Sequence, residues 1–282
     1  MLVVINYANG TPYEDFRKWN TWSAKHFGRA DDVWEYSEKD ISTQYKKEHE
    51  QIFSYKRGAG LWLWKPYIVL DALSKLKEND WLFYCDSGSV VIRSIHHLIN
   101  CAEENNTPIL LVEQPLLNRQ FTKRETIKAM GVEDNNENQL LSGFILLKKC
   151  QETIEIIKEW QAGCQNEDWV SYKHFHSEIE EFDDFYSHRE DQSILTNIAI
   201  KRNLPTFRDP SDYGEFPHMY YSVNYSYVPK GYPNSNYPTI ILSNRRFSPP
   251  QYVTRYLLKK ILNIFGLINP DKIIADKNKK GL

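Results

Sequence analysis

The amino-acid sequence predicts an α/β fold built on a mostly parallel sheet. Short apolar and aromatic runs, typical of buried strands, alternate along the first 200 residues with longer segments whose apolar residues recur at helical spacing. Such alternation is typical of parallel sheets covered by helices. Apolar residues make up 41% of the 282 residues and charged residues 26%, which suffices for a large buried core.

The first elements carry the clearest local signals. The apolar run from Leu2 to Tyr7 indicates a buried strand. Thr11-Pro12-Tyr13-Glu14 is a capping box with proline at the first helical position, and Gly28 is expected to end that helix. The same criteria predict strands at 33–36, 81–85, 109–112 and 143–147, and helices at 42–54, 66–76, 94–102, 152–160 and 191–203.

The ends of the predicted strands indicate where a ligand binds. Parallel strands bring their carboxyl ends to one edge of the sheet, and α/β proteins bind ligands beyond that edge. Tyr7, Asp86 and Glu113 each lie at the end of a predicted strand. We therefore expect these three residues at the functional edge.

The C-terminal part differs in composition from the rest of the chain. Residues 245–282 hold nine Lys or Arg and two Asp, a net charge of +7, so residues 1–244 carry −9. We expect a main domain over 1–244 and a basic amphipathic tail over 245–282, with a helix beginning near Ser248. Such a helix lies in a membrane interface or docks on the sheet with its lysines solvated, and both interpretations stay open. The segments 166–186 and 208–237 are expected to be irregular.

Composition excludes several classes of protein. A net charge of −2 argues against a general nucleic-acid binder. The four cysteines, at 85, 101, 150 and 164, form no CxxC pair, so we expect reduced thiols and a cytoplasmic location. No secretion signal and no run of about 20 apolar residues is recognised. The motifs of serine hydrolases, P-loop NTPases and dinucleotide oxidoreductases are missing.

Two segments suit the recognition of a diphosphate. Asp86, at the end of an aromatic strand and followed by Ser87 and Gly88, could hold Mg²⁺ or Mn²⁺ against phosphate oxygens, although aspartate is also a common turn residue. Arg57 and Lys65 flank a glycine-containing loop that precedes a helix, an arrangement that favours anions. A basic loop can equally be solvated surface.

A third segment carries carboxylates and histidines. Glu190 and Asp191 begin a predicted helix, where acidic residues either suit the helix dipole or serve as a general base. His174, His176 and His188 lie close to them in sequence, which leaves a metal-dependent hydrolase as an alternative. A non-catalytic carbohydrate-binding protein is a second alternative.

Three motifs, in order, resemble a family of bacterial glycosyltransferases encoded in capsule and O-antigen clusters. The run from Lys56 to Ile68, KRGAGLWLWKPYI, is similar to the family segment RGxGYWLWKPYII. The strand end at Tyr84 to Gly88 is similar to YxDxG, and the run from His188 to Leu195 is similar to HRxDQSIL. The resemblance covers about residues 1–215 and leaves out the basic tail.

The resemblance implies a GT-A-type fold, a Rossmann-like sheet that binds a nucleotide sugar. The implied donor-binding residues are Tyr7, Arg57, Trp64, Lys65, Asp86, Ser87 and Gly88. Asp191 and Glu190 are the implied catalytic carboxylates, and His188 and Gln192 the implied acceptor-binding residues. Asp86 is the implied ligand of Mn²⁺ or Mg²⁺, but Gly88 stands where the family's DxD motif has its second carboxylate. A metal-independent mode, with Arg57 and Lys65 compensating charge, is therefore also open.

The function implied is transfer of a sugar from a nucleotide diphosphate, UDP above all, to a hydroxyl of a lipid-linked glycan. The segment from His188 to Asp191 fits an inverting pattern and Asp191-Gln192 a retaining one, and we favour the inverting pattern. We expect a cytoplasmic protein that contacts the inner membrane face through its C-terminal helix, with no nucleic-acid partner.

Overall fold

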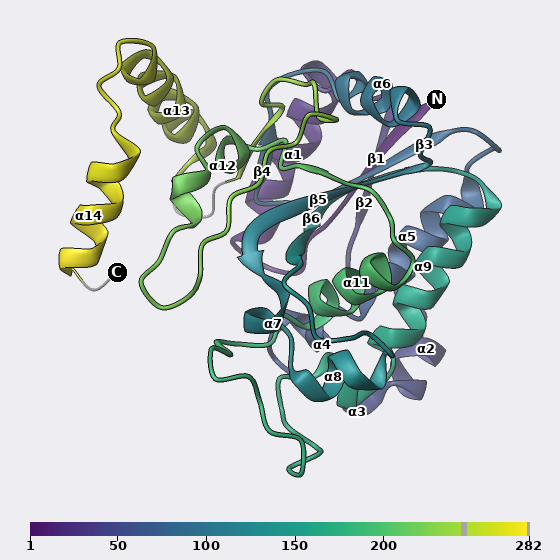
Figure 1. Ribbon diagram of the computed structural model, residues 1–282. Helices are drawn as coiled ribbons and strands as arrows, with labels where there is room; N and C mark the ends of the chain where they lie inside the picture. The colour runs from purple at the N-terminus through teal and green to yellow at the C-terminus, as the bar shows by residue number, and fades with distance from the viewer. Residues whose placement is uncertain (244–246, 281–282) are drawn as a thin grey trace.

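The computed structural model describes residues 1–243 and 247–280 and is organised around a six-stranded sheet (Figure 1). The strand order is β2-β1-β3-β6-β5-β7. All neighbouring strands are parallel except β6, which runs antiparallel to β3 and β5. The strands are β1 (Leu2–Tyr7), β2 (Asp32–Tyr36), β3 (Trp81–Cys85), β5 (Ile109–Leu117), β6 (Asn138–Lys148) and β7 (Thr206–Arg208). The predicted α/β class with flanking helices is confirmed.

One face of the sheet is covered by α5 (Trp64–Lys75), α9 (Gln151–Cys164) and α11 (Glu190–Lys201). Alternate strand residues point to this face because successive side chains of a strand lie on opposite sides. Ile5 of β1 thus packs in one cluster with Ile68, Trp160 and Ile194 of the three helices. The short helices α2 (Thr43–Glu48) and α3 (Glu50–Phe53) extend the same layer.

The opposite face is covered by α1 (Tyr13–His26) and α6 (His96–Glu104). Val4 of β1 packs there with Ala24 and Leu98. The thiols of Cys85, Cys101 and Cys164 are buried in the two cores, and all four cysteines are free, as expected.

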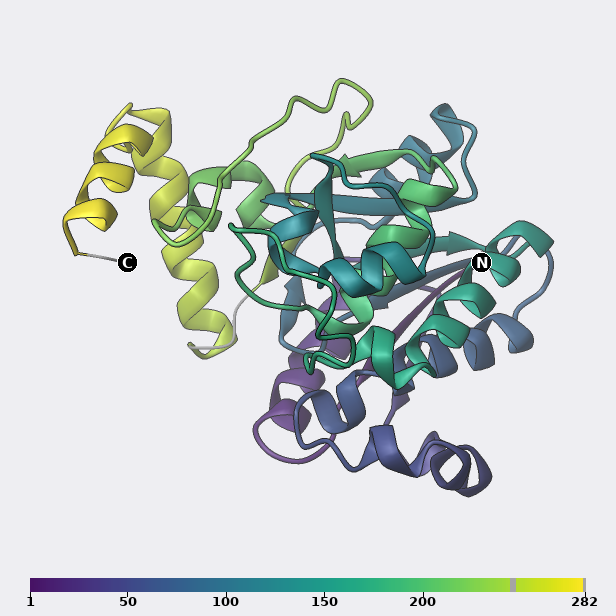
Figure 2. The ribbon, with the colours of Figure 1, turned by 60° about the horizontal axis from the view of Figure 1, so that its bottom comes forward.

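A two-stranded sheet joins the main body to the C-terminal helices. β4 (Ser89–Val91) pairs antiparallel with β8 (Ile241–Ser243), and α12 (Asp212–Glu215) and the 3-10 helix η2 (Pro217–Tyr220) lie beside them. The chain ends in α13 (Pro249–Ile264) and α14 (Pro270–Lys280). Both views place these two helices at one end of the molecule, away from α5 and α9 (Figure 1 and Figure 2).

Helix α13 is docked on the main body through two tyrosines. Tyr256 is buried against Phe216 and Leu242 and donates a hydrogen bond to Glu215, and Tyr252 donates one to Asp212. The predicted domain boundary between residues 244 and 245 lies outside the described residues. Within the described ranges, none of the helices has the length and apolar character that a bilayer crossing requires.

The remaining helices are one or two turns long. They are α4 (Gly58–Leu61), α7 (Asn118–Phe121), α8 (Arg124–Ala129), α10 (Glu167–Val170) and η1 (Glu38–Asp40). Of the segment 166–186, which was predicted to be irregular, residues 167–170 form α10 and residues 171–186 are irregular.

Candidate active site

A cavity of about 500 Å³ opens at the carboxyl ends of β1 and β3. The two strands are parallel, with Ile5 opposite Tyr84, so that Tyr7 and Asp86 emerge side by side. This is the edge at which the sequence predicts ligand binding, and the volume lies within the usual range for small-molecule sites.

Hydrogen bonds from buried residues hold the turn after β3 in place. Tyr84 donates a hydrogen bond to Asp86 Oδ1 over 2.7 Å, and the Asp86 backbone N–H donates to the Gly143 carbonyl over 2.9 Å. Asn20 of α1 donates to the Ser89 carbonyl over 2.9 Å and to the Asp86 carbonyl over 3.3 Å. The position of the Asp86 carboxylate is thus fixed before any ligand binds.

A buried lysine links the two candidate aspartates. Lys65 Nζ lies 3.2 Å from Asp191 Oδ2 and 3.8 Å from Asp86 Oδ1, and the Lys65 side chain is 3% exposed. The same ammonium donates to the Oγ and the carbonyl oxygen of Ser142 over 3.2 and 3.3 Å. Burial raises the pKa of Asp191, while Lys65 counteracts that rise. Lys65 therefore serves as the counter-ion of two carboxylates: Asp86, which lines the cavity, and Asp191, which is buried and does not line it.

A second ion pair connects Arg57, which lines the cavity, to the buried Glu190 of α11. Arg57 Nε lies 2.6 Å from Glu190 Oε1 and Arg57 Nη2 donates to Oε2 over 3.3 Å, a bidentate arrangement. Burial raises the pKa of Glu190 to about 7 in spite of Arg57. Glu190 is the first residue of α11 and has a φ of 37°, a left-handed conformation that is uncommon for a residue other than glycine.

The glycines of the loop between Arg57 and Lys65 are required by the backbone conformation of that loop. Residues 58–62 all have positive φ, and a Cβ on Gly58 would lie 2.2 Å from the ring of Trp62. Trp64 donates from Nε1 to the Gly58 carbonyl over 2.9 Å and stacks on Tyr7 with ring centroids 3.7 Å apart. The left-handed turn thus aligns Arg57 and the aromatic side chains around the cavity.

Six of the seven expected donor-binding residues line the cavity. They are Tyr7, Arg57, Trp64, Asp86, Ser87 and Gly88. The seventh, Lys65, lies behind the cavity wall and acts through Asp86 and Asp191. Sequence reasoning missed the lining residues Asn9, Tyr13, Lys56 and Tyr84. A signal for three of them was present, since Tyr13 lies within the predicted capping box, Lys56 begins the segment 56–68 and Tyr84 begins the segment 84–88.

The expected acceptor-binding residues do not line this cavity. His188 is buried, and its Nδ1 accepts a hydrogen bond from the Lys123 backbone N–H over 3.2 Å. Burial lowers the pKa of His188 well below its ordinary value, so His188 is a neutral residue that supports the chain before α11. Gln192 is also buried and donates to Gln139 over 2.9 Å.

Two further expectations are corrected. The three histidines of the hydrolase alternative form no metal site, since no group of three or more His, Cys, Asp or Glu suited to a metal ion occurs in the described ranges. Glu113 does not end its strand, because β5 continues with bulges to Leu117. Glu113 pairs with Lys230 over 2.9 Å instead. Gln114, the next residue in the chain, accepts a hydrogen bond from Gln192 over 3.4 Å, so Gln114 and not Glu113 faces α11.

The side chains around Asp86 are a poor fit for a divalent cation. Such ions need one or two carboxylates together with phosphate oxygens and water. Asp86 is one carboxylate, but the Lys65 ammonium is 3.8 Å from it, and Asp191, the next carboxylate, is held by that same ammonium. A cation between the two aspartates would face a positive charge already in place.

The chain matches no protein-family model and no curated protein. Among solved structures it is similar to mouse xyloside xylosyltransferase 1 in its apo form, with a TM-score of 0.48 and 12% identity over 88% of this chain and 99% of the other. It is also similar to a glycosyltransferase involved in glycosylation of the major capsid of PBCV-1, with a TM-score of 0.47 and 9% identity over 91% and 98%. At these values the likeness carries no argument about activity, which is therefore inferred from the residues of this chain.

Proposed function

We propose that this protein is a glycosyltransferase that uses a nucleotide-diphosphate sugar, with UDP as the nucleotide. The observation that carries the proposal is the cavity at the carboxyl ends of β1 and β3. It combines aromatic walls, two cations at its rim and a carboxylate turn at its floor. The order of the three sequence motifs supports the same activity in the synthesis of a bacterial surface polysaccharide.

The cavity offers a separate partner for each part of such a donor. Tyr13, which is 48% exposed, presents a ring on which a nucleobase can stack. Lys56 and Arg57 can neutralise the diphosphate, since Glu190 takes only the Nε and Nη2 groups of Arg57. Asp86 and Ser87 can accept and donate hydrogen bonds to ribose or sugar hydroxyls.

The reaction would break the bond between the anomeric carbon and the β-phosphate oxygen. The nucleotide diphosphate leaves with the electron pair, and the acceptor oxygen forms the new bond to the anomeric carbon. Asp191 is our candidate for the carboxylate near this carbon, with Glu190 beside it. In the inverting course that we favour, the proton of the acceptor hydroxyl passes to this carboxylate. No step is assigned to a metal ion, and Arg57 and Lys56 supply the positive charge at the leaving group.

We further propose a lipid-linked glycan as acceptor and a cytoplasmic protein bound peripherally to the inner membrane face. The support is the tail of net charge +7 together with a C-terminal helix that leaves apolar side chains uncovered. Basic residues near an anionic bilayer contribute about 1 kcal/mol each to binding.

The proposal is tested by donor turnover without an acceptor. Purified protein is incubated with a panel of nucleotide sugars, and the release of nucleotide diphosphate is measured. One donor is expected to be hydrolysed, and Asp191→Asn is expected to reduce the rate by about 100-fold or more, while UDP still raises the melting temperature. Asp183→Asn, in the exposed loop before α11, is the matched control and should retain the full rate. Silence across the panel, without a thermal shift from UDP, GDP or CMP, would contradict the proposed function.

A further inference from the structure

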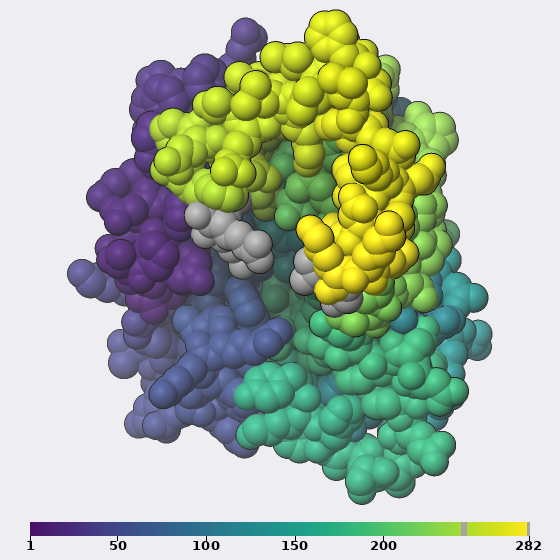
Figure 3. Space-filling model, turned by 90° about the vertical axis from the view of Figure 1, so that its left-hand side faces the viewer, coloured from purple at the N-terminus to yellow at the C-terminus, as the bar shows by residue number. Residues whose placement is uncertain are grey.

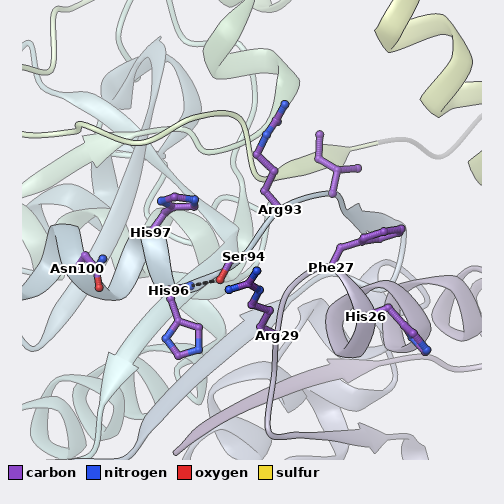
Figure 4. A pocket seen from close by; sticks show the side chains of 9 residues that line it. His26, Phe27, Arg29, Arg93, Ser94, His96, His97 and Asn100 are labelled. Atoms are coloured by element: carbon purple, nitrogen blue, oxygen red, sulfur yellow. Dashed lines mark hydrogen bonds between the residues drawn. The ribbon is translucent and has the colours of Figure 1, made fainter.

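The pocket between the end of α1 and the beginning of α6 does not define a ligand. Its volume is about 440 Å³. Figure 4 shows the Arg93 side chain directed away from Arg29, and Arg93 donates a hydrogen bond to the Thr239 carbonyl. The two guanidiniums therefore do not converge on one anion. The surface beside Arg57 differs, because it borders the cavity of the candidate active site.

Tyr172 is an exposed aromatic residue on that surface, with 46% of its area accessible. The guanidinium carbon of Arg57 lies 5.9 Å from the centre of the Tyr172 ring and 6.0 Å from that of Trp62. Trp62 lines the cavity and Tyr172 does not. Figure 3 shows the segment 171–186, in green, beside the blue segment that contains Arg57. A ligand on Tyr172 would therefore lie next to the cavity.

A buried ion pair holds the backbone on both sides of Tyr172. Lys123 is fully buried, and its ammonium lies 2.6 Å from Glu125 Oε1. The same ammonium donates hydrogen bonds to the carbonyls of Asp168 and Lys173 over 2.7 and 2.6 Å. Burying two charges is costly unless they are paired and hydrogen-bonded, and here the extra hydrogen bonds go to backbone carbonyls. The pair thus fixes a stretch of chain that is largely irregular.

Further contacts fix the same segment and orient the ring. Glu125 accepts hydrogen bonds from the backbone N–H groups of Phe175 and His176 over 3.3 and 3.0 Å. Tyr172 packs edge-to-face against Tyr55, with ring centroids 5.9 Å apart. An exposed ring held in this way loses little conformational freedom when a ligand binds. Tyr172 is therefore suited to be a preformed binding platform.

The charge of the segment indicates which ligand suits this platform. Residues 166–186 hold seven Asp or Glu and one Lys, a net charge of −6. A surface of this charge repels anionic ligands and favours uncharged ones. An uncharged sugar fits both properties, because its ring can lay a face of C–H groups on the aromatic ring while its hydroxyls stay in water.

We propose that Tyr172 forms an acceptor subsite, on which an uncharged sugar residue stacks next to Arg57 and Glu190. The proposal rests on the glycosyltransferase function proposed above and deepens it, since it names a contact and a chemical class for the acceptor. His188 and Gln192, which the family resemblance implied for the acceptor, are buried, so the acceptor needs another surface. Glu190 is paired with Arg57, so a sugar on Tyr172 would lie close to the candidate catalytic carboxylates.

The test is saturation-transfer difference NMR of the full chain with methyl glycosides. The panel contains uncharged hexoses, 6-deoxyhexoses and N-acetylhexosamines, together with methyl glucuronide as the acidic counterpart. At least one uncharged glycoside is expected to bind, and the glucuronide is not. Tyr172→Ala should weaken that binding by about tenfold, as for one lost stacking contact, while Tyr172→Phe should retain it. Phe27→Ala, 48% exposed at the end of α1, is the matched control and should bind as the wild type does.

Addition of UDP should leave the glycoside signal in place, because Tyr172 is not part of the donor cavity. Loss of the signal on adding UDP would place the sugar in that cavity and overturn the subsite. Equal binding by the wild type and Tyr172→Ala, binding of the glucuronide, or no signal from any uncharged glycoside would overturn it as well. A loss in Tyr172→Phe as large as in Tyr172→Ala would overturn stacking as the mode of binding.

A kinetic measurement separates this proposal from the proposed function. Donor hydrolysis needs no acceptor and the NMR assay needs no turnover, so the failure of one is told apart from the failure of the other. Hydrolysis by Tyr172→Ala should stay within about threefold of the wild type, since the contact with Arg57 is an exposed cation–π contact. With the glycoside that binds as acceptor, the KM for the glycoside should rise about tenfold in Tyr172→Ala at a similar kcat. An unchanged KM would overturn the acceptor subsite.

Discussion

Replacing Lys65 tests the charge balance of the candidate active site most directly. The Lys65 ammonium is buried and lies 3.2 Å from Asp191 and 3.8 Å from Asp86. Lys65→Met keeps a long flexible side chain and removes the charge. Breaking a buried ion pair by removing one partner lowers the free energy of unfolding by about 3–5 kcal/mol, because the other charge stays buried alone. Asp86 contributes less to this loss, since it is 25% exposed and accepts a hydrogen bond from Tyr84.

The double variant separates this explanation from a simple packing defect. Lys65→Met/Asp191→Asn removes both charges, so most of the lost stability should return. Urea unfolding of the wild type, the two single variants and the double variant, followed by circular dichroism near neutral pH, gives the coupling energy. We expect this energy to exceed about 2 kcal/mol, within the range for residues in direct contact.

The pH dependence gives a second readout of the same pair. Lys65 lowers the pKa of Asp191, so that pKa rises further in Lys65→Met. A carboxyl group whose folded-state pKa is raised destabilises the fold above that pKa, and the penalty is relieved as the pH falls and the group is protonated. The stability loss of Lys65→Met should therefore shrink on acidification. The reasoning is refuted if Lys65→Met costs less than about 1 kcal/mol, or if the two substitutions are additive.

Three further predictions follow from the same site. Because Lys65 stands beside Asp86, donor turnover should be retained in EDTA; a loss of about 100-fold that Mn²⁺ restores would contradict this. Burial raises the pKa of Glu190 from its ordinary value of 4.5 to about 7, so at intermediate pH the folded chain holds a proton that the unfolded chain has released. Unfolding free energy, measured in urea, should accordingly fall between about pH 5 and pH 8 more steeply in the wild type than in Glu190→Gln. Tyr13→Ala should weaken UDP binding by calorimetry about tenfold, as expected for one lost stacking contact, whereas Tyr186→Ala, equally exposed but outside the cavity, should not.

The residues that sequence analysis placed well are those whose position depends on local signals. Tyr7 and Asp86 each follow a short apolar strand, and parallel pairing of consecutive units brings such strand ends together. Arg57 precedes a loop whose glycines indicate positive φ angles in the backbone. For these residues a single segment and the general geometry of parallel sheets were sufficient.

The residues that were placed wrongly depend on long-range pairing. Glu113 was expected at a strand end, but β5 is extended by pairing with the antiparallel β6, which begins 21 residues beyond it. The family resemblance implied His188 as an acceptor-binding residue, and its burial, which comes with a contact to Lys123, 65 residues away, could not be read from its own segment. The strands β4 and β8 are three residues each and exist only because they pair with one another across 150 residues of chain. No local pattern encodes these contacts.

The first residues of α11 couple two parts of the site that sequence analysis had treated separately. Glu190 fixes Arg57, which lines the cavity, and Asp191, the next residue, fixes Lys65 behind the cavity wall. One helix terminus therefore sets the positions of the cation that we propose for the diphosphate and of the cation that neutralises Asp86 and Asp191. A shift of α11 would disturb both at once. One carboxylate would satisfy the helix dipole. Two adjacent buried carboxylates are tolerated here because each has its own cation, Arg57 for Glu190 and Lys65 for Asp191.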